Sequence, residues 1–272
     1  MYSVKDALIK ATKKLNRVCD IPNKEARILL AFYLQKDQLW LITHDTEKVV
    51  NEDYFELIER RLENEPIEYI TNRANFYGEE FFVDSNVLIP RPETELLVDL
   101  VVSTCKGIKK PVIVEIGTGS GIISIMLAKL LPNAIIKAVD ISDGALDVAQ
   151  LNAEKHGVEE HIKFIHSDLL DNVADKNFDI LVSNPPYIAN EESLHVGLSY
   201  EPSLALFGGK EGDEILKKII DTYFDKKIKF LACEMGYDQK SRLTKYLETM
   251  ELTVDFYQDL AGLDRGFIVK KG

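Results

Sequence analysis

The chain has 272 residues, of which 46% are apolar and 29% are charged. This composition is typical of a folded globular protein and excludes a disordered or fibrous one. The 33 basic and 45 acidic residues leave a formal net charge of -12, whereas a protein that binds nucleic-acid phosphates usually carries a basic face. We therefore expect no nucleic-acid partner.

The three cysteines are far apart and form no C-x-x-C pair, so we expect neither a disulfide framework nor a metal site. Asp6 stands where a signal peptide would begin its apolar core, and no apolar run is long enough to span a bilayer. These features predict a cytoplasmic protein that does not associate with membranes.

The N-terminal residues 1–74 have the apolar spacing of helices. The first helix is expected to begin at Ser3, with Asp6 in its first turn, and three more are expected over residues 23–34, 38–43 and 52–63. This region is predicted to be a small helical bundle, which is either a packing subdomain or a module that binds a partner. Residues 75–89 follow as a predicted β-hairpin linker.

Residues 90–272 show a regular alternation of strand and helix patterns. After a helix over residues 94–104, strands are expected over 112–116, 134–139, 162–165, 178–182, 228–233, 252–257 and 266–269. Helices are expected between them over 122–131, 142–156, 212–224 and 239–250. This order predicts an α/β fold with a doubly wound, mostly parallel sheet.

A glycine-rich loop separates the first predicted strand of that sheet from its helix. Gly117, Gly119 and Gly121 follow Glu115 in the spacing G-x-G-x-G, which lets the backbone turn sharply and lets a ligand approach closely. A dinucleotide fingerprint would need G-x-G-x-x-G, and a phosphate-binding P-loop would need a following G-K-S/T. Neither pattern is present. The loop is therefore either a tight turn without a ligand or the site of a ligand other than a dinucleotide.

Two carboxylates follow the next strands at the same predicted edge of the sheet. Asp140 ends the second strand, where a carboxylate can accept hydrogen bonds from ribose hydroxyls, and Asp168 follows the third, where an adenine amino group could donate to it. With the glycine loop, these residues predict a site for a ligand that contains adenosine.

The fourth predicted strand stops abruptly at Asn184-Pro185-Pro186-Tyr187. The prolines cannot continue a strand ladder, and they stiffen the loop so that the Asn184 side chain and the Pro185 carbonyl are available as acceptors. Two acceptors on the two N–H groups of a planar amide or aromatic amine would hold its nitrogen for methylation, while Tyr187 stacks on its plane. The alternative is a proline-stiffened turn without chemistry.

Together these motifs resemble the amino-group methyltransferases of class I, which use S-adenosyl-L-methionine, and in particular the HemK or PrmC family of peptide-chain release factor glutamine methyltransferases. The resemblance spans most of the chain. It is carried by Asn-Pro-Pro-Tyr at 184–187, Pro-Arg-Pro-Glu-Thr-Glu at 90–95, Asn-Phe-Tyr-Gly at 75–78, residues 66–70, Glu201-Pro202, residues 205–209 with Gly212, and residues 259–265.

The resemblance implies a Rossmann-like, seven-stranded mixed sheet and a particular set of site residues. The residues implied for S-adenosyl-L-methionine are Glu115, Gly117, Thr118, Gly119, Ser120, Gly121, Asp140, Ile141, Asp168, Leu169 and Asn184. Asn184, Pro185, Pro186 and Tyr187 would hold the glutamine amide, and Arg91 and Glu93 would line the substrate site. The family often has an aromatic residue where this chain has Leu169, which can still pack on adenine.

The family methylates the glutamine of the Gly-Gly-Gln loop of release factors, so the resemblance implies a release factor partner, which the N-terminal helices of a monomeric enzyme would contact. One rival is a paralogue that methylates a glutamine of a ribosomal protein. A DNA amino-methyltransferase would need a basic face, which a net charge of -12 does not favour. A non-enzymatic adenosine sensor would leave Asn-Pro-Pro-Tyr without a task.

Overall fold

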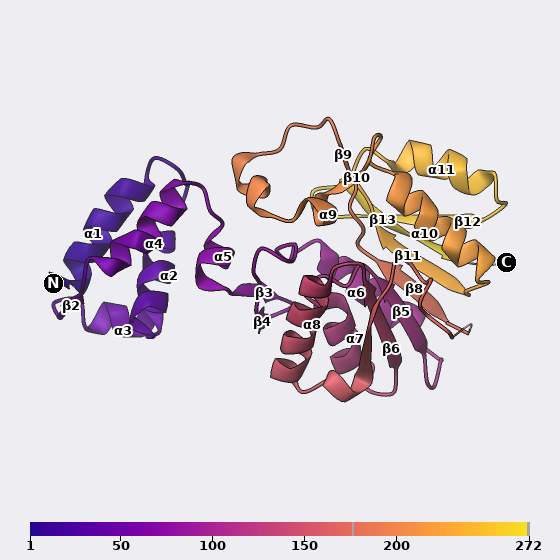
Figure 1. The fold of residues 1–272 in the computed structure, drawn as a ribbon, viewed down its shortest axis with the longest axis horizontal. Helices are drawn as coiled ribbons and strands as arrows, with labels where there is room; N and C mark the ends of the chain where they lie inside the picture. The colour runs from indigo at the N-terminus through magenta and orange to yellow at the C-terminus, as the bar shows by residue number, and fades with distance from the viewer. Residues whose placement is uncertain (176, 271–272) are drawn as a thin grey trace. The chain divides into compact units, whose positions relative to one another are not determined.

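The computed structural model describes residues 1–175 and 177–270, and the chain divides into two compact units (Figure 1). One unit comprises residues 1–73 together with 194–200, and the other comprises residues 74–193 and 201–272. The segment 194–200 therefore packs with the N-terminal helices although it follows the fourth strand of the α/β sheet in sequence. No sequence pattern indicated this.

The N-terminal unit is a helical bundle, as predicted. Its described elements are β1 (Tyr2–Ser3), α1 (Val4–Leu15), α2 (Pro22–Leu34), α3 (Gln38–Thr43), β2 (Lys48–Val50), α4 (Asp53–Leu62), α5 (Ile67–Thr71) and the short helix η2 (Val196–Tyr200). Ser3 caps α1, since its Oγ accepts a hydrogen bond from the Asp6 amide at 3.1 Å. The buried Tyr54 hydroxyl donates to the Ala26 carbonyl and so joins α4 to α2.

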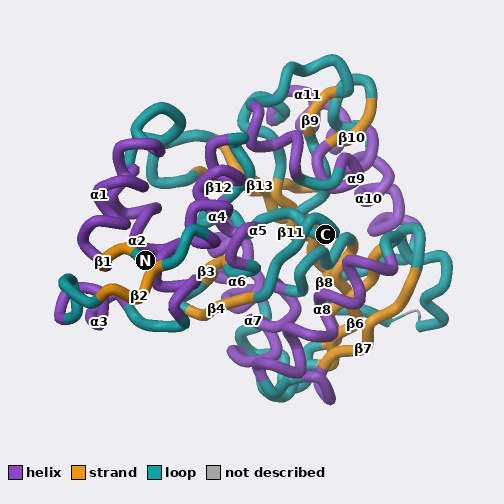
Figure 2. Tube along the Cα trace, turned by 60° about the vertical axis from the view of Figure 1, so that its left-hand side comes forward, coloured by secondary structure: helices purple, strands orange, loops and turns teal. Residues whose placement is uncertain are grey.

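The larger unit begins with the antiparallel hairpin of β3 (Ala74–Phe76) and β4 (Glu79–Phe81), which lie side by side in Figure 2. Its other elements are α6 (Thr94–Thr104), β5 (Val112–Ile116), α7 (Ile122–Leu130), β6 (Ile135–Asp140), α8 (Asp143–His156), η1 (Glu159–His161), β7 (Ile162–His166), β8 (Ile180–Ser183), β9 (Ile188–Ala189), α9 (Ser203–Leu206), β10 (Phe207–Gly209), α10 (Glu214–Asp225), β11 (Phe230–Glu234), α11 (Lys240–Glu248), β12 (Thr253–Gln258) and β13 (Asp264–Lys270).

Seven strands form one mixed sheet in the order β12-β13-β11-β8-β5-β6-β7. The five strands from β11 to β7 are parallel, β13 pairs antiparallel with β11, and β12 pairs antiparallel with β13 at the edge of the sheet. This confirms the predicted α/β class and the doubly wound, seven-stranded mixed sheet.

Helices cover both faces of the sheet, and the alternation of side chains along each strand explains how (Figure 1). On β5, Ile113 joins the buried cluster of α6 and α7, whereas Val114 and Ile116 join the cluster of α10 and α11. Each of the five parallel strands therefore contributes apolar side chains to two cores, which is why these strands read as nearly continuous apolar runs.

Two strands begin two residues later than predicted. Phe178 and Ile228 were expected to begin the fourth and fifth strands, but β8 begins at Ile180 and β11 at Phe230. Both side chains are buried in the core, with exposures of 4% and 1%. Burial thus extends beyond the hydrogen-bonded ladder, and an apolar run alone does not mark the start of pairing. Within the described parts of the chain, no helix is long and apolar enough to cross a membrane.

Candidate active site

The carboxyl ends of three neighbouring strands bring the predicted motifs together. β5 lies between β6 and β8, with Ile116 opposite Val139 on one side and opposite Ser183 on the other. The glycine loop follows β5, Asp140 ends β6, and Asn184 follows β8. The chain continues from β5 to β6 and β7 on one side and then crosses to β8 on the other side. Doubly wound sheets usually bind their ligands in the crevice at the point where the strand order reverses in this way.

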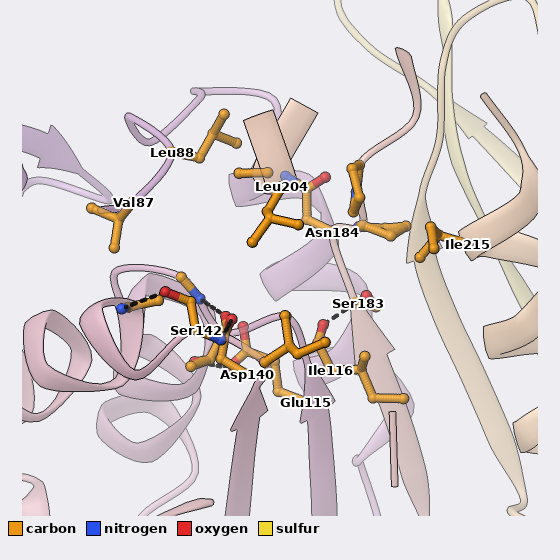
Figure 3. A pocket seen from close by; sticks show the side chains of 18 of the residues that line it. Val87, Leu88, Glu115, Ile116, Asp140, Ser142, Ser183, Asn184, Leu204 and Ile215 are labelled. Carbon is orange, nitrogen blue, oxygen red and sulfur yellow. Dashed lines mark hydrogen bonds between the residues drawn. The ribbon is translucent and has the colours of Figure 1, made fainter. Parts of the chain in front are cut away.

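A cavity of about 270 Å³ lies over this edge. The sequence-predicted residues that line it are Arg91, Glu115, Gly117, Thr118, Gly119, Ser120, Asp140, Ile141, Asp168, Leu169, Asn184, Pro185 and Pro186. Gly121, Tyr187 and Glu93 are not among the described residues that line it. Apolar residues that were not predicted, including Val87, Leu88 and Leu204, lie across the cavity from Glu115 and Asp140 (Figure 3).

The glycine loop is tied to the end of β6. Gly117, Gly119 and Gly121 all have positive φ angles, of 72°, 53° and 82°, so glycine is the residue best suited to each position. The amides of Gly117 and Thr118 both donate to the Val139 carbonyl. An added Cβ on Gly121 would lie 3.2 Å from Ala149 of α8. The absence of a side chain therefore lets the start of α7 lie close to α8.

Asp140 organises the loop as well as facing the cavity. Its Oδ2 accepts from the Gly119 amide at 2.9 Å, and its Oδ1 accepts from the Ser142 amide at 3.0 Å. Burial raises the pKa of this carboxyl, and the two backbone amides oppose that shift. Each oxygen keeps acceptor capacity for a ligand hydroxyl.

Glu115 is fully buried, and its two carboxyl oxygens differ in their hydrogen bonds. Oε2 accepts from the Thr118 hydroxyl at 2.9 Å, from the Ser124 amide at 3.2 Å and from the Ser124 hydroxyl. Oε1 is buried without a hydrogen-bond partner in the described structure, although Glu115 lines the cavity. Burial raises the pKa of Glu115 to about 8. A cationic ligand group beside Oε1 would satisfy this atom and favour the ionised carboxylate.

Asn152 supports the glycine loop from behind, and sequence reasoning missed it. Its Nδ2 donates to the carbonyls of Ser120 and Phe82, and its Oδ1 accepts from the Phe82 amide. The side chain is fully buried on α8. A polar residue on the apolar stripe of a helix is the signal that could have identified it, because a buried amide needs partners.

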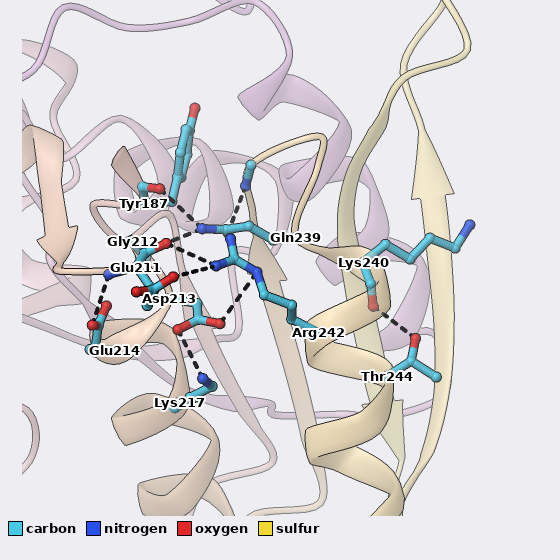
Figure 4. A network of polar contacts seen from close by, with 11 residues as sticks. Tyr187, Glu211, Gly212, Asp213, Glu214, Lys217, Gln239, Lys240, Arg242 and Thr244 are labelled. Atoms are coloured by element: carbon cyan, nitrogen blue, oxygen red, sulfur yellow. Dashed lines mark hydrogen bonds and ion pairs between the residues drawn. The ribbon is translucent and has the colours of Figure 1, made fainter. Parts of the chain in front are cut away.

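A second buried amide, Gln239, anchors the Asn-Pro-Pro-Tyr loop. Its Nε2 donates to the carbonyls of Tyr187 and Gly212, each at 3.0 Å, and its Oε1 accepts from the Gly236 amide (Figure 4). The loop also packs closely on glycines: a Cβ on Gly208 would lie 2.5 Å from the Pro186 carbonyl oxygen, and one on Gly212 would lie 2.6 Å from that of Tyr187. The glycines noted at 205–212 therefore let the backbone approach this loop.

Arg91 lines the cavity while its guanidinium is paired. It bonds Oε1 of the buried Glu201 at 2.6 Å, and Oε2 of Glu201 accepts from the Ile89 amide at 3.1 Å. Glu201 therefore fixes the Pro-Arg-Pro segment at the cavity. Across residues 1–175 and 177–270, no group of three or more acidic, histidine or cysteine side chains is placed to hold a metal ion.

The sheet order, the glycine loop after β5 and the Asn-Pro-Pro-Tyr loop after β8 define a class I methyltransferase fold. Residues 92–198 match the family "Methyltransferase small domain", and residues 6–71 match the family "PrmC N-terminal domain". The chain is 34% identical over 283 residues to the release factor glutamine methyltransferase of Clostridium acetobutylicum, covering 99% of both chains. It belongs to the release factor glutamine methyltransferase family.

Other relatives are larger proteins. The chain is 37% identical over 293 residues to the bifunctional methyltransferase of Rickettsia typhi, covering 97% of this chain but 56% of that one. It thus spans little more than half the length of such relatives. Among solved structures, the ribosomal protein L11 methylase of Lactobacillus delbrueckii subsp. bulgaricus aligns with a TM-score of 0.50 and 23% identity, over 70% of this chain and 83% of that one. This is a likeness of fold.

Proposed function

We propose that this chain transfers a methyl group from S-adenosyl-L-methionine to the side-chain amide nitrogen, N5, of the glutamine in the Gly-Gly-Gln loop of peptide-chain release factors. The observation that carries the proposal is that one cavity joins the glycine loop and Asp140 to Asn184 and Pro185. The release factor glutamine methyltransferases that the chain resembles over nearly their whole length support the release factor as the substrate.

The cavity residues fit S-adenosyl-L-methionine. The unpaired Oε1 of Glu115 suits the cationic amino group of its methionine part, while Asp140 and Asp168 offer acceptors for the hydroxyl and amino groups of its adenosine. Leu169 would contribute apolar contact in place of aromatic stacking. When bound, this cofactor supplies an electrophilic methyl group.

The chain's own part in the reaction is positioning. Asn184 and the Pro185 carbonyl would accept hydrogen bonds from the two N–H groups of the glutamine, which orients its nitrogen and raises its electron density. Pro186 stiffens the loop, and Tyr187, whose carbonyl Gln239 holds, would pack against the amide plane. The proton can leave after methyl transfer, so no strong base is needed.

We further propose that residues 1–74 form a substrate-binding domain and residues 75–89 a linker to the catalytic domain at 90–272. Arg91 and Glu93 would line the substrate side, with Arg91 held in place by Glu201. The enzyme would act as a cytoplasmic monomer on a protein substrate without binding nucleic acid directly.

Cofactor binding is expected to release a proton near neutral pH. The pKa of Glu115 is about 8, so this carboxyl is protonated below that pH, and a cationic amine beside Oε1 requires it to ionise. From about pH 6 to about pH 7, affinity should rise by up to about tenfold per pH unit. Calorimetric titration in buffers of different ionisation enthalpy measures the released proton. Glu115→Gln should abolish the release, and wild-type binding without proton release would refute this role.

The proposal is tested with isotope-labelled methyl donor and a panel of acceptors: a purified release factor, the same factor with its loop glutamine replaced by alanine, ribosomal proteins and DNA. We expect label on the unmodified factor alone. Label only on ribosomal proteins would identify the paralogous activity, and label only on DNA would indicate an amino-methyltransferase of nucleic acid. Cofactor binding with no transfer to any acceptor would indicate a sensor.

A further inference from the structure

A chain of two hydrogen bonds leads from Asn184 into the core of the catalytic unit. Asn184 Nδ2 donates to Thr94 Oγ1 at 3.1 Å, and the Thr94 hydroxyl donates to Glu234 Oε2 at 2.8 Å. The three residues come from the loop after β8, the first position of α6 and the last position of β11. Thr94 and Glu234 are buried, with exposures of 0% and 2%.

The donor and acceptor roles in these two hydrogen bonds follow from the chemistry of Glu234. An ionised carboxylate can only accept hydrogen bonds, so the single hydroxyl proton of Thr94 is directed to Glu234. Only lone pairs of Thr94 Oγ1 then remain for Asn184, which must present its Nδ2 rather than its Oδ1. The carbonyl edge of the Asn184 amide is thereby turned away from Thr94.

This orientation matters because the two edges of an asparagine amide have opposite properties. Nδ2 has two donors, whereas Oδ1 has two acceptor lone pairs. A substrate amide that offers its own N–H groups requires Oδ1. A flipped Asn184 would bring donors against donors, and the nitrogen to be methylated would lose one of the acceptors that hold it.

We propose that Thr94 and Glu234 are positioning residues that hold the Asn184 amide with its Oδ1 toward the substrate nitrogen. The proposal rests on the proposed function for its catalytic consequence, but the orientation itself is a property of the protein alone. Thr94 lines the cavity beside Asn184, while Glu234 acts through Thr94.

The surroundings of Glu234 make this arrangement sensitive to pH. The charged and titratable groups around it are Arg91 and Glu93 before α6, Tyr187 after β8, Tyr257 on β12 and Arg265 on β13. Burial raises the pKa of Glu234 to about 7, against the opposing effects of the Thr94 hydrogen bond and of Arg265. A protonated Glu234 can donate to Thr94, which frees the Thr94 hydroxyl to donate to Asn184 Oδ1. The acceptor orientation is therefore expected above about pH 7 and should be lost as the pH falls through that value.

Nuclear magnetic resonance of the full chain tests the orientation without any substrate. We expect dipolar contacts between the Asn184 side-chain amide protons and Thr94 at high pH, which weaken as the pH falls through about 7. In Glu234→Gln these contacts should no longer change near that pH. Wild-type amide protons that show no contact with Thr94 at high pH would overturn the proposal, whatever the enzyme methylates.

The kinetic arm uses Thr94→Val, which removes the hydroxyl while keeping the shape, and Thr94→Ser, which restores it. We expect Thr94→Val to lower kcat by about tenfold with cofactor Kd changed less than about threefold, and Thr94→Ser to stay near wild type. Thr104→Val is the matched control and should be unchanged, since Thr104 lies on the same helix and its hydroxyl donates to the Leu100 carbonyl of α6. The loss of the acceptor orientation should make wild-type kcat fall as the pH decreases through about 7, and this fall should be absent in Glu234→Gln. A fully active Thr94→Val enzyme, or a Glu234→Gln enzyme whose kcat still falls as in the wild type, would overturn the positioning role.

Discussion

Replacing Asn184 by alanine is expected to lower kcat for release factor methylation by at least about a hundredfold, because the variant loses an acceptor that is aimed at the reacting nitrogen. Asn184 is held by Thr94, and the loop that carries it is anchored by Gln239, so the remaining scaffold should persist without the side chain. Cofactor Kd should therefore change by no more than a few-fold. Single-turnover methylation and calorimetric binding measure the two quantities separately.

Asn190→Ala is the matched control for that variant. Asn190 follows β9, a few positions beyond Asn184, is exposed and is not among the described residues that line the cavity, so both kcat and Kd should remain at wild-type values. If cofactor binding collapsed in Asn184→Ala while turnover of the bound enzyme survived, Asn184 would be a cofactor residue and not the acceptor for the substrate amide.

Replacing Asp140 by alanine should instead act on the cofactor, with Kd raised by about tenfold to about a hundredfold. The variant loses the acceptors proposed for the ribose hydroxyls and also the bonds from the amides of Gly119 and Ser142, which shape the glycine loop. At saturating cofactor, kcat should recover most of its wild-type value, since Asn184 and Pro185 are untouched.

Asp143→Ala provides the comparison for Asp140. Asp143 lies three positions further along the chain with a side chain that is 80% exposed, and its carboxylate pairs with His166 outside the cavity lining. Its removal changes the net charge equally but should leave cofactor Kd unchanged. Equal weakening by both substitutions would mean that general electrostatics, and not direct acceptance of hydrogen bonds, accounts for the effect of Asp140.

The convergence of the glycine loop, Asp140 and Asn184 could be predicted from the sequence because parallel strands end at a shared edge. Each motif needs only its own strand and the alternation of strands and helices to be placed. The resemblance of the flanking segments to a known family added the substrate class, which the tetrapeptide alone does not specify.

The supporting contacts could not be predicted in this way. Thr94 meets Glu234 across 140 sequence positions, and Asn152 meets Phe82 across 70. No pattern of neighbouring residues in the sequence indicates such pairs, because they form only when the helices pack on the sheet. Likewise β1 and β2 are too short, at two and three residues, to produce a readable alternation, and their pairing was not predicted.

The central claim is that the Asn-Pro-Pro-Tyr loop presents a glutamine amide to the methyl donor. The most direct measurement is fragmentation mass spectrometry of release factor incubated with the enzyme and S-adenosyl-L-methionine, which locates the transferred group. We predict one added methyl group on the side-chain nitrogen of the Gly-Gly-Gln glutamine, and none after incubation with Asn184→Ala under the same conditions. A methyl group on any other residue, or equal modification by the variant, would contradict the account.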